Sequence, residues 1–167
     1  GQLDPRVAAV LQLRPSLVNR IAGELLDANW EPSLHEDILQ AVGLPWVVEH
    51  DRGRSRDPEF RRTILRIYER SCAFCGYDAR LGDGLLAVEA AHIRWHAADG
   101  PDTTENGLAL CTLHHRAFDG GALALDDHHN ILVSQHLTGG AVVVRTLLDL
   151  AGTRARPPLR GEPGPAP

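Results

Sequence analysis

The chain has 167 residues, of which 43% are hydrophobic and 23% are charged, so it should bury a core rather than be disordered throughout. Roughly 100–200 residues make one domain, which leaves room here for one domain with a small annex. A net charge of −5, taken alone, argues against a nucleic-acid partner. No apolar run approaches the ~18 residues that span a bilayer, so no membrane association is expected. Methionine is absent even at position 1, so we expect a processed product or a fragment.

Residues 1–48 are expected to form a helical segment, a remnant of or linker from an upstream domain. Apolar residues recur at three- and four-residue steps over 5–26, and Pro15 should divide this stretch into two helices. Residues 33–42 are predicted to form a third helix. Residues 49–56 are polar and rich in Arg, Asp and Gly, which predicts a linker.

Residues 57–150 are expected to form the main domain. A helix is predicted over about 58–70, with apolar residues on one face and arginines around the other. An alternating pattern from residue 85 predicts a strand, and a loop covers 97–105. The remaining predictions are strands at 107–111, 122–125, 130–134 and 141–146, a helix at 112–119, and a flexible Pro/Arg-rich tail over 151–167.

The charges are unevenly distributed along the chain. All 17 basic residues are arginines, and residues 52–80 hold eight of them against four acids. The flanking segments 1–51 and 81–151 are acidic. The overall charge therefore conceals a basic strip beside an acidic, histidine-rich segment.

The chain has three cysteines, and an odd number does not suit a disulfide framework. Cys72 and Cys75 form one pair at two-residue spacing, and Cys111 and His114 form a second. Zinc takes four such ligands in a tetrahedron, and Gly76 lets the first turn close. We therefore predict a structural Zn²⁺ site, which suits a reducing, cytoplasmic compartment. Three buried thiols and a surface histidine are the alternative.

After the first cysteine pair, three segments follow in this order: Ala90-Ala91-His92-Ile93, then Asn106-Gly107-Leu108-Ala109-Leu110-Cys111, then His114-His115-Arg116-Ala117-Phe118-Asp119. The pattern resembles the HNH, or ββα-metal, nucleases of the branch with a Cys-rich zinc site. The resemblance covers about 57–135. It implies an α+β fold with a ββα-metal core and a treble-clef-like zinc knuckle, preceded here by the helical segment.

The resemblance also implies roles for individual residues. His92 would be the general base, Asn106 would orient it, and His115 would hold a catalytic Mg²⁺ or Mn²⁺. A neutral histidine can take a proton from water near pH 7, and a divalent ion can offset charge on a phosphate. The expected reaction is hydrolysis of double-stranded DNA to 5′-phosphate and 3′-hydroxyl ends.

One position departs from the family pattern. Many members carry Asp or His directly before the first histidine as a second metal ligand, where this chain has Ala91. The candidate substitutes are Glu89, Asp119 and His96. The adjacent His114 and His115 could also exchange roles, although the C-x-x-H spacing favours His114 for zinc.

Arginines of the basic strip are candidates for phosphate contacts. We single out Arg61, Arg62 and Arg66, together with Arg94 and Arg116 beside the two catalytic histidines. The alternative for the strip is a solvated helix face with local ion pairs.

The segment 26–38 resembles the junction between a sulfur-binding domain and its HNH domain in bacterial type IV restriction enzymes specific for phosphorothioate-modified DNA. This resemblance implies a modification-dependent cleavage module. Cutting both strands with one site per chain would require a homodimer or two sequential nicks. The first alternative is an HNH nuclease without modification preference, of mobile-element or toxin type. The second is a non-catalytic zinc-stabilised DNA-binding module, which remains an alternative because Ala91 stands where many family members have a metal ligand.

Overall fold

The computed structural model describes residues 4–44, 58–95, 98 and 100–166. The chain forms two compact units that divide between Gly53 and Arg54. The expected linker over 49–56 lies outside the described residues, as does His96. Among the helices that are described, none has the length and apolar character to cross a membrane.

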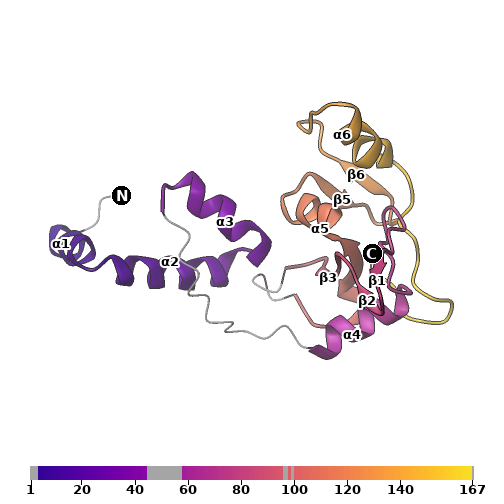
Figure 1. Cartoon of the computed structure of the whole chain (residues 1–167), viewed down its shortest axis with the longest axis horizontal. Coiled ribbons are helices and arrows are strands. Elements are labelled where there is room, and N and C mark those ends of the chain that lie inside the picture. The colour runs from indigo at the N-terminus through magenta and orange to yellow at the C-terminus, as the bar shows by residue number, and fades with distance from the viewer. Residues whose placement is uncertain (1–3, 45–57, 96–97, 99, 167) are drawn as a thin grey trace. The chain divides into compact units, whose positions relative to one another are not determined.

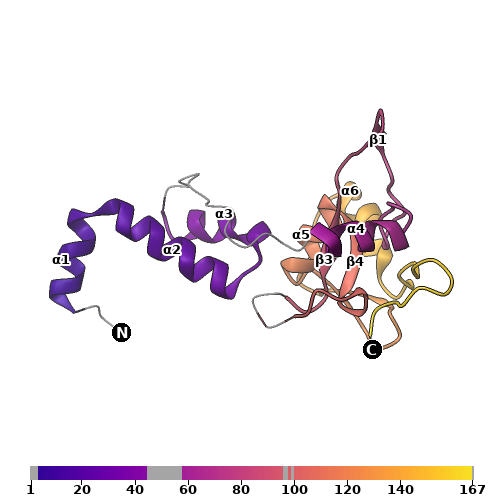
Figure 2. The ribbon, with the colours of Figure 1, turned by 90° about the horizontal axis from the view of Figure 1, so that it is seen from below.

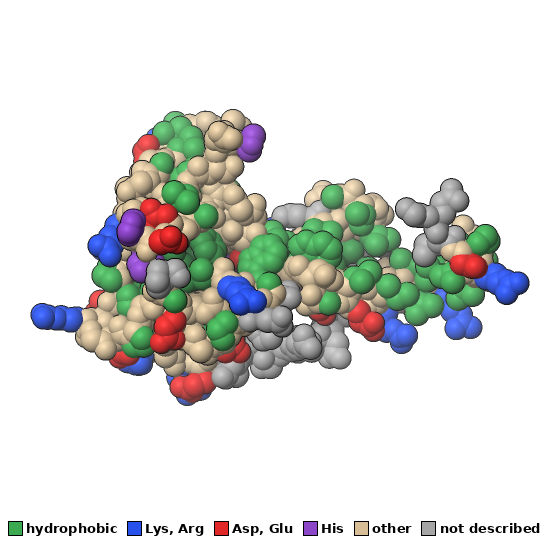
Figure 3. Space-filling view, turned by 180° about the vertical axis from the view of Figure 1, so that it is seen from behind, with side chains coloured by type: hydrophobic (Ala, Val, Ile, Leu, Met, Phe, Trp, Pro, Cys, Tyr) green, Lys and Arg blue, Asp and Glu red, His purple; other side chains and the backbone are tan. Residues whose placement is uncertain are grey.

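The first unit contains the helices α1 (Pro5–Leu13), α2 (Pro15–Asn29) and α3 (Pro32–Ala41). Each begins with proline, whose missing N–H is unneeded there and whose ring presets a helical φ. Arg14 has non-helical backbone angles between α1 and α2, which confirms the predicted break. Figure 3 shows hydrophobic side chains along this unit; the exposed ones include Val7, Val10, Leu13, Ile21 and Leu25.

The second unit begins with α4 (Pro58–Ile67). Its buried face carries Phe60, Ile64 and Ile67, while its arginines are exposed, as the amphipathic pattern predicts. The helix ends at Ile67 rather than near residue 70. Glu69 and Arg70 adopt left-handed φ angles of 53° and 59°, which turn the chain toward the first cysteine pair.

The centre of this unit is an antiparallel hairpin of β3 (Val88–His92) and β4 (Gly107–Cys111), followed directly by α5 (Thr112–Asp119). Figure 1 shows β3 between α5 and α4. A short 3₁₀ turn, η2 (Thr104–Asn106), precedes β4. The predicted α+β class with a ββα core is therefore confirmed.

Two further hairpins flank this centre. β5 (Leu123–Leu125) and β6 (Ile131–Val133) pair antiparallel and confirm the two strands predicted there. β1 (Arg80–Leu81) and β2 (Gly84–Leu85) form a short hairpin that the sequence pattern did not predict. Figure 2 shows it projecting from the second unit.

The predicted strand over 141–146 is wrong, because this segment forms the helix α6 (Ala141–Thr146), followed by η3 (Leu148–Leu150). Its three consecutive valines favour a strand on intrinsic preference alone. Tertiary packing decides otherwise: Val143 and Leu147 lie one helical turn apart and both pack against the core, while Val142 is 64% exposed.

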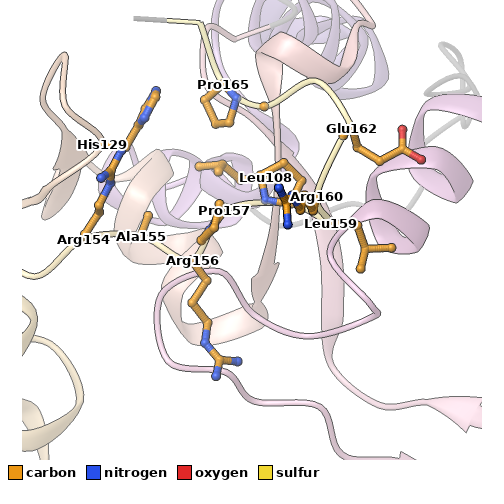
Figure 4. A pocket seen from close by; sticks show the side chains of 13 residues that line it. Leu108, His129, Arg154, Ala155, Arg156, Pro157, Leu159, Arg160, Glu162 and Pro165 are labelled. Atoms are coloured by element: carbon orange, nitrogen blue, oxygen red, sulfur yellow. The ribbon is translucent and has the colours of Figure 1, made fainter.

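The C-terminal segment is extended, as its prolines suggest, but it is fastened to the second unit. The N–H of Arg156 donates to Ala73 O at 2.8 Å, and that of Leu159 donates to Ile67 O at 2.7 Å. Ala155 is buried. The segment curves around a cavity of about 560 Å³ beside Leu108 of β4, which Figure 4 shows from close by.

Candidate functional site

The two Cys/His pairs meet in one cluster. The ligand atoms of Cys72, Cys75, Cys111 and His114 all lie within 4.8 Å of one another, and all but Cys75 are buried. Gly76 has a left-handed φ of 76°, and its N–H donates to Cys72 O at 2.8 Å, which closes the knuckle. The donor set is the one that zinc takes in structural sites.

His114 is oriented for metal binding through its Nδ1 atom. Nδ1 lies 3.1 Å from the Cys111 sulfur and 3.4 Å from the Cys72 sulfur. Nε2 lies 2.8 Å from Thr146 O, so it donates to a carbonyl at the end of α6. Such a second partner fixes the ring and its tautomer in metal sites. The helix α6, where the sequence predicts a strand, therefore supports the cluster.

The thiols influence one another's ionisation. Hydrogen bonding to Cys111 and Cys75 holds the pKa of Cys72 far below its usual range, whereas contact with Cys111 raises the pKa of Cys75 and contact with Cys72 raises the pKa of Cys111. Burial lowers the pKa of His114, but hydrogen bonding to Cys72, Cys75 and the Thr146 carbonyl together more than offsets this and raises the pKa to about 10. The cluster thus concentrates negative charge on sulfur, which suits a divalent cation.

His92 lies at the end of β3 and is only 3% exposed. Its ring stacks on Phe60 of α4, with centroids 4.3 Å apart and planes at 6°. Nε2 lies 2.6 Å from Asp102 Oδ1. The imidazole is therefore held both by a stacked ring and by a carboxylate.

Asn106 is buried at the end of η2, directly before β4, and its side chain holds the chain that follows His92. Its Oδ1 accepts from Arg94 N at 2.8 Å, and its Nδ2 donates to Arg94 O at 3.0 Å and Pro101 O at 2.9 Å. The amide thus clamps both ends of the loop between β3 and η2. Asp102 directly follows Pro101 in that loop.

His115 lies on α5 between two carboxylates. Nδ1 is 2.7 Å from Glu89 Oε2, and Nε2 is 3.4 Å from Asp119 Oδ2. His115 and Asp119 are buried, whereas the Glu89 side chain is 43% exposed. Both carboxylates proposed as second metal ligands therefore lie beside the predicted metal-binding histidine. Oxygen and imidazole donors of this kind suit Mg²⁺ or Mn²⁺.

The His92 side chain and His115 of α5 lie on opposite faces of the hairpin. His92 pairs with Gly107, and a Cβ at Gly107 would lie 2.3 Å from Ile64 Cδ1, so this face packs on α4. Glu89, three residues before His92, belongs to the face that contacts α5. The structure therefore brings Glu89, His115 and Asp119 together, and His92, Asp102 and Asn106 around one loop.

A cavity of about 250 Å³ opens beside the hairpin and is bordered by one contact residue of each histidine. It is lined by Phe60, Arg61, Glu89 and Ala90. Phe60 stacks on His92, and Glu89 contacts His115. A cation, a carboxylate and an aromatic ring therefore meet at one opening beside the hairpin.

The arginines predicted to contact DNA are all exposed. Two of them are in ion pairs: Arg62 lies 2.8 Å from Glu59 and Arg66 lies 2.7 Å from Glu162. Arg94 Nε donates to Ala98 O at 2.8 Å. Arg61 lines the 250 Å³ cavity, and Arg116 follows His115 on α5.

Sequence reasoning missed two partners in these clusters. Asp102 stands in a polar loop whose composition does not distinguish one carboxylate from another. The Thr146 carbonyl belongs to the backbone, and its position depends on a helix that the valine run obscured. Only the strand–loop–strand spacing around His92 and Asn106 could have pointed to a loop carboxylate near the histidine.

Residues 72–126 match the family model described as HNH endonuclease. A solved structure described as "Modification dependent TagI restriction endonuclease" is 27% identical, with a TM-score of 0.45; the match covers 58% of this chain and 33% of that one. The chain thus corresponds to about a third of that protein. No curated protein sequence matches it. The family match covers about a third of the chain, spans the Cys/His cluster, His92, Asn106 and His115, and supports a nuclease enzyme.

Proposed function

We propose that the protein is a metal-dependent DNA endonuclease whose cleavage site is built from His92, Asn106 and His115. The observation that carries the proposal is the HNH family match over 72–126, which contains all three residues in the expected order. The contacts of His92 with Asp102 and of His115 with Glu89 and Asp119 support it, because each histidine is held by at least one carboxylate.

In this proposal His92 takes a proton from a water molecule. The water oxygen bonds to phosphorus, and the bond from phosphorus to the 3′ oxygen breaks. The 3′ oxygen takes a proton from solvent water, and His92 returns its proton to solvent. The products are 5′-phosphate and 3′-hydroxyl ends. Asn106 acts by holding the loop between β3 and η2, since its three hydrogen bonds fix both ends of that loop.

His115 would hold the catalytic Mg²⁺ or Mn²⁺, with Asp119 and Glu89 as the available carboxylates. A bound divalent ion supplies stabilisation of negative charge on the phosphate and on the leaving oxygen. Nε2 of His115 and the Asp119 carboxylate face each other at 3.4 Å, which favours Asp119 as the second ligand. Glu89, at 2.7 Å from Nδ1, is then the group that orients the ring.

The substrate is proposed to be double-stranded DNA. Arg61 at the cavity, with Arg94 and Arg116 near the two histidines, offers cations for phosphates on either side of the cut. Arg62 and Arg66 would have to exchange carboxylate partners for phosphates. One site per chain would cut both strands as a homodimer or by two nicks.

We further propose that cleavage depends on DNA modification, of the phosphorothioate kind. The support is the resemblance of residues 26–38 to the junction that joins a sulfur-binding domain to an HNH domain. The domain organisation that we propose keeps 1–48 as the helical segment, 49–56 as a linker, and 57–150 as the nuclease domain. A bacterial cytoplasmic enzyme would fit this role.

The test is a plasmid-nicking assay with Mg²⁺ or Mn²⁺ on the wild type and on His92→Ala. The substitution should lower the rate by about 10²–10⁴-fold, the usual worth of a general base. His128→Ala changes an exposed histidine of the turn before β6 and should cut like the wild type. Equal cleavage by the wild type and His92→Ala would remove His92 as the base.

Two arms extend this assay. Comparing phosphorothioate, methylated and plain DNA tests the modification preference, and equal rates would favour a nuclease without one. Zinc-loaded protein that binds DNA but cuts none of these substrates would favour the non-catalytic module, to which Ala91 points.

A further inference from the structure

His92 is fixed in two independent ways. Stacking on Phe60 at 4.3 Å sets the plane of its ring. The contact between Nε2 and Asp102 Oδ1, at 2.6 Å, sets the rotation of the ring within that plane. The Asp102 side chain is 26% exposed, so water also reaches its carboxylate.

The loop that carries Asp102 is constrained on both sides. Gly100 N donates to Trp95 O at 2.9 Å, and a Cβ at Gly100 would lie 1.9 Å from Arg94 O, so only glycine fits this turn. Asn106 then holds Arg94 and Pro101 through its side chain. The position of Asp102, next to Pro101, is therefore set by the fold rather than by its own contact with His92.

An ionised carboxylate can only accept hydrogen bonds. Nε2 of His92 must therefore carry a proton in this contact, and the lone pair of the neutral ring lies on Nδ1. When the ring takes a second proton, the carboxylate also stabilises the positive charge that forms. A buried imidazole without such a partner would have neither its tautomer nor its charge supported.

We propose that Asp102 is the positioning residue of the nuclease site: it holds His92 in the Nε2-protonated form, so that Nδ1 is the atom that takes the proton from the attacking water. The proposal rests on the proposed nuclease function for its kinetic consequence. Asn106 then acts on His92 indirectly, by fixing the loop that presents Asp102.

The first test is a double-mutant cycle on the zinc-loaded full chain, measured as single-turnover nicking of plasmid DNA. Asp102→Asn keeps the shape of the side chain but removes its charge, and it should slow cleavage roughly 10–100-fold, the usual cost of losing such a partner. Asp102→Glu should restore part of the rate. DNA affinity should stay within about twofold of the wild type, because Asp102 acts on the base. Asp127→Asn, an exposed carboxylate of another turn, is the matched control.

In the His92→Ala background, Asp102→Asn should cause no further loss, because its effect passes through the histidine. An equal loss in both backgrounds, or a wild-type rate for Asp102→Asn, would overturn the proposal.

The second test does not depend on cleavage. The ¹⁵N shifts of the His92 ring should report the Nε2-protonated tautomer in the wild type and a mixture of tautomers in Asp102→Asn. A protein that cuts no DNA but shows these shifts would refute the nuclease function alone. An Nδ1-protonated ring in the wild type would refute the role of Asp102.

Discussion

Gly107 lies opposite His92 in the β3–β4 pairing, on the face that packs against α4. A Cβ there would lie 2.3 Å from Ile64 Cδ1 and 3.1 Å from Phe60 Cε2. Ile64 is fully buried, so it has no room to retreat. The absence of a side chain at this one position lets α4 come close enough for Phe60 to stack on the histidine.

Gly107→Ala should therefore lower the free energy of unfolding by about 1–3 kcal/mol, the usual cost of overpacking a core. Urea denaturation followed by circular dichroism would measure it. Gly140→Ala is the matched control, because a Cβ at Gly140 meets nothing within 4 Å. A loss no larger than that of the control would mean that α4 and the hairpin are not in contact at this point.

At the scale of elements, the α6 helix determines how well the Cys/His cluster is supported. Its last residue offers the carbonyl that receives Nε2 of His114, and Leu147 after it is buried in the core. The helix is short and rich in β-branched residues, which are weak helix formers. Packing, rather than intrinsic preference, keeps it helical.

Two valines of α6 test this. Val142 is 64% exposed, so Val142→Ala should leave stability unchanged or raise it by about 0.5 kcal/mol through helix propensity. Val143 packs against the core, so Val143→Ala should cost roughly 1–2 kcal/mol of buried surface. Thermal unfolding of both variants gives the comparison. Destabilisation by Val142→Ala as large as that by Val143→Ala would fit a strand instead.

The parts of the site that sequence could predict are those with local signals. The two-residue spacing of the cysteine pairs, the alternation in β3 and the amphipathic pattern of α4 each depend on neighbouring residues. Asp102 and the α6 carbonyl could not be predicted, because their roles depend on contacts between residues 10 and 32 positions apart. The end of α4 was also missed, since two non-glycine residues take left-handed angles there.

At the scale of the whole molecule, the Cys/His cluster joins elements that are distant in the chain. It links the turn after α4 to the β4–α5 junction, and His114 extends it to α6. Zinc binding should therefore supply much of the folding free energy of the second unit. None of the residues described in the first unit, a separate set of helices, belongs to this cluster.

Chelation should accordingly unfold the second unit cooperatively while the helical signal of the first unit persists, as followed by circular dichroism with tryptophan fluorescence.

The raised pKa of Cys75 and of Cys111 means that both thiols keep their protons until a metal displaces them. Zinc binding then releases protons, so its affinity should fall as the pH is lowered from 8 to 6. Cys111→Ser removes one of these two thiol protons, so the dependence should become shallower. Melting that neither chelator nor pH alters would contradict a structural metal.

The contact between the C-terminal segment and the zinc knuckle has a consequence of its own. The Arg156 guanidinium lies over Gly76, where a Cβ would be 2.6 Å from its nitrogen, and the Arg156 N–H is bonded to Ala73. Ala73 lies between the first two cysteines, and Gly76 directly follows the second. Loss of metal would therefore loosen the segment after Ala155, and its extended backbone, which the knuckle holds in place, would become a substrate for proteases.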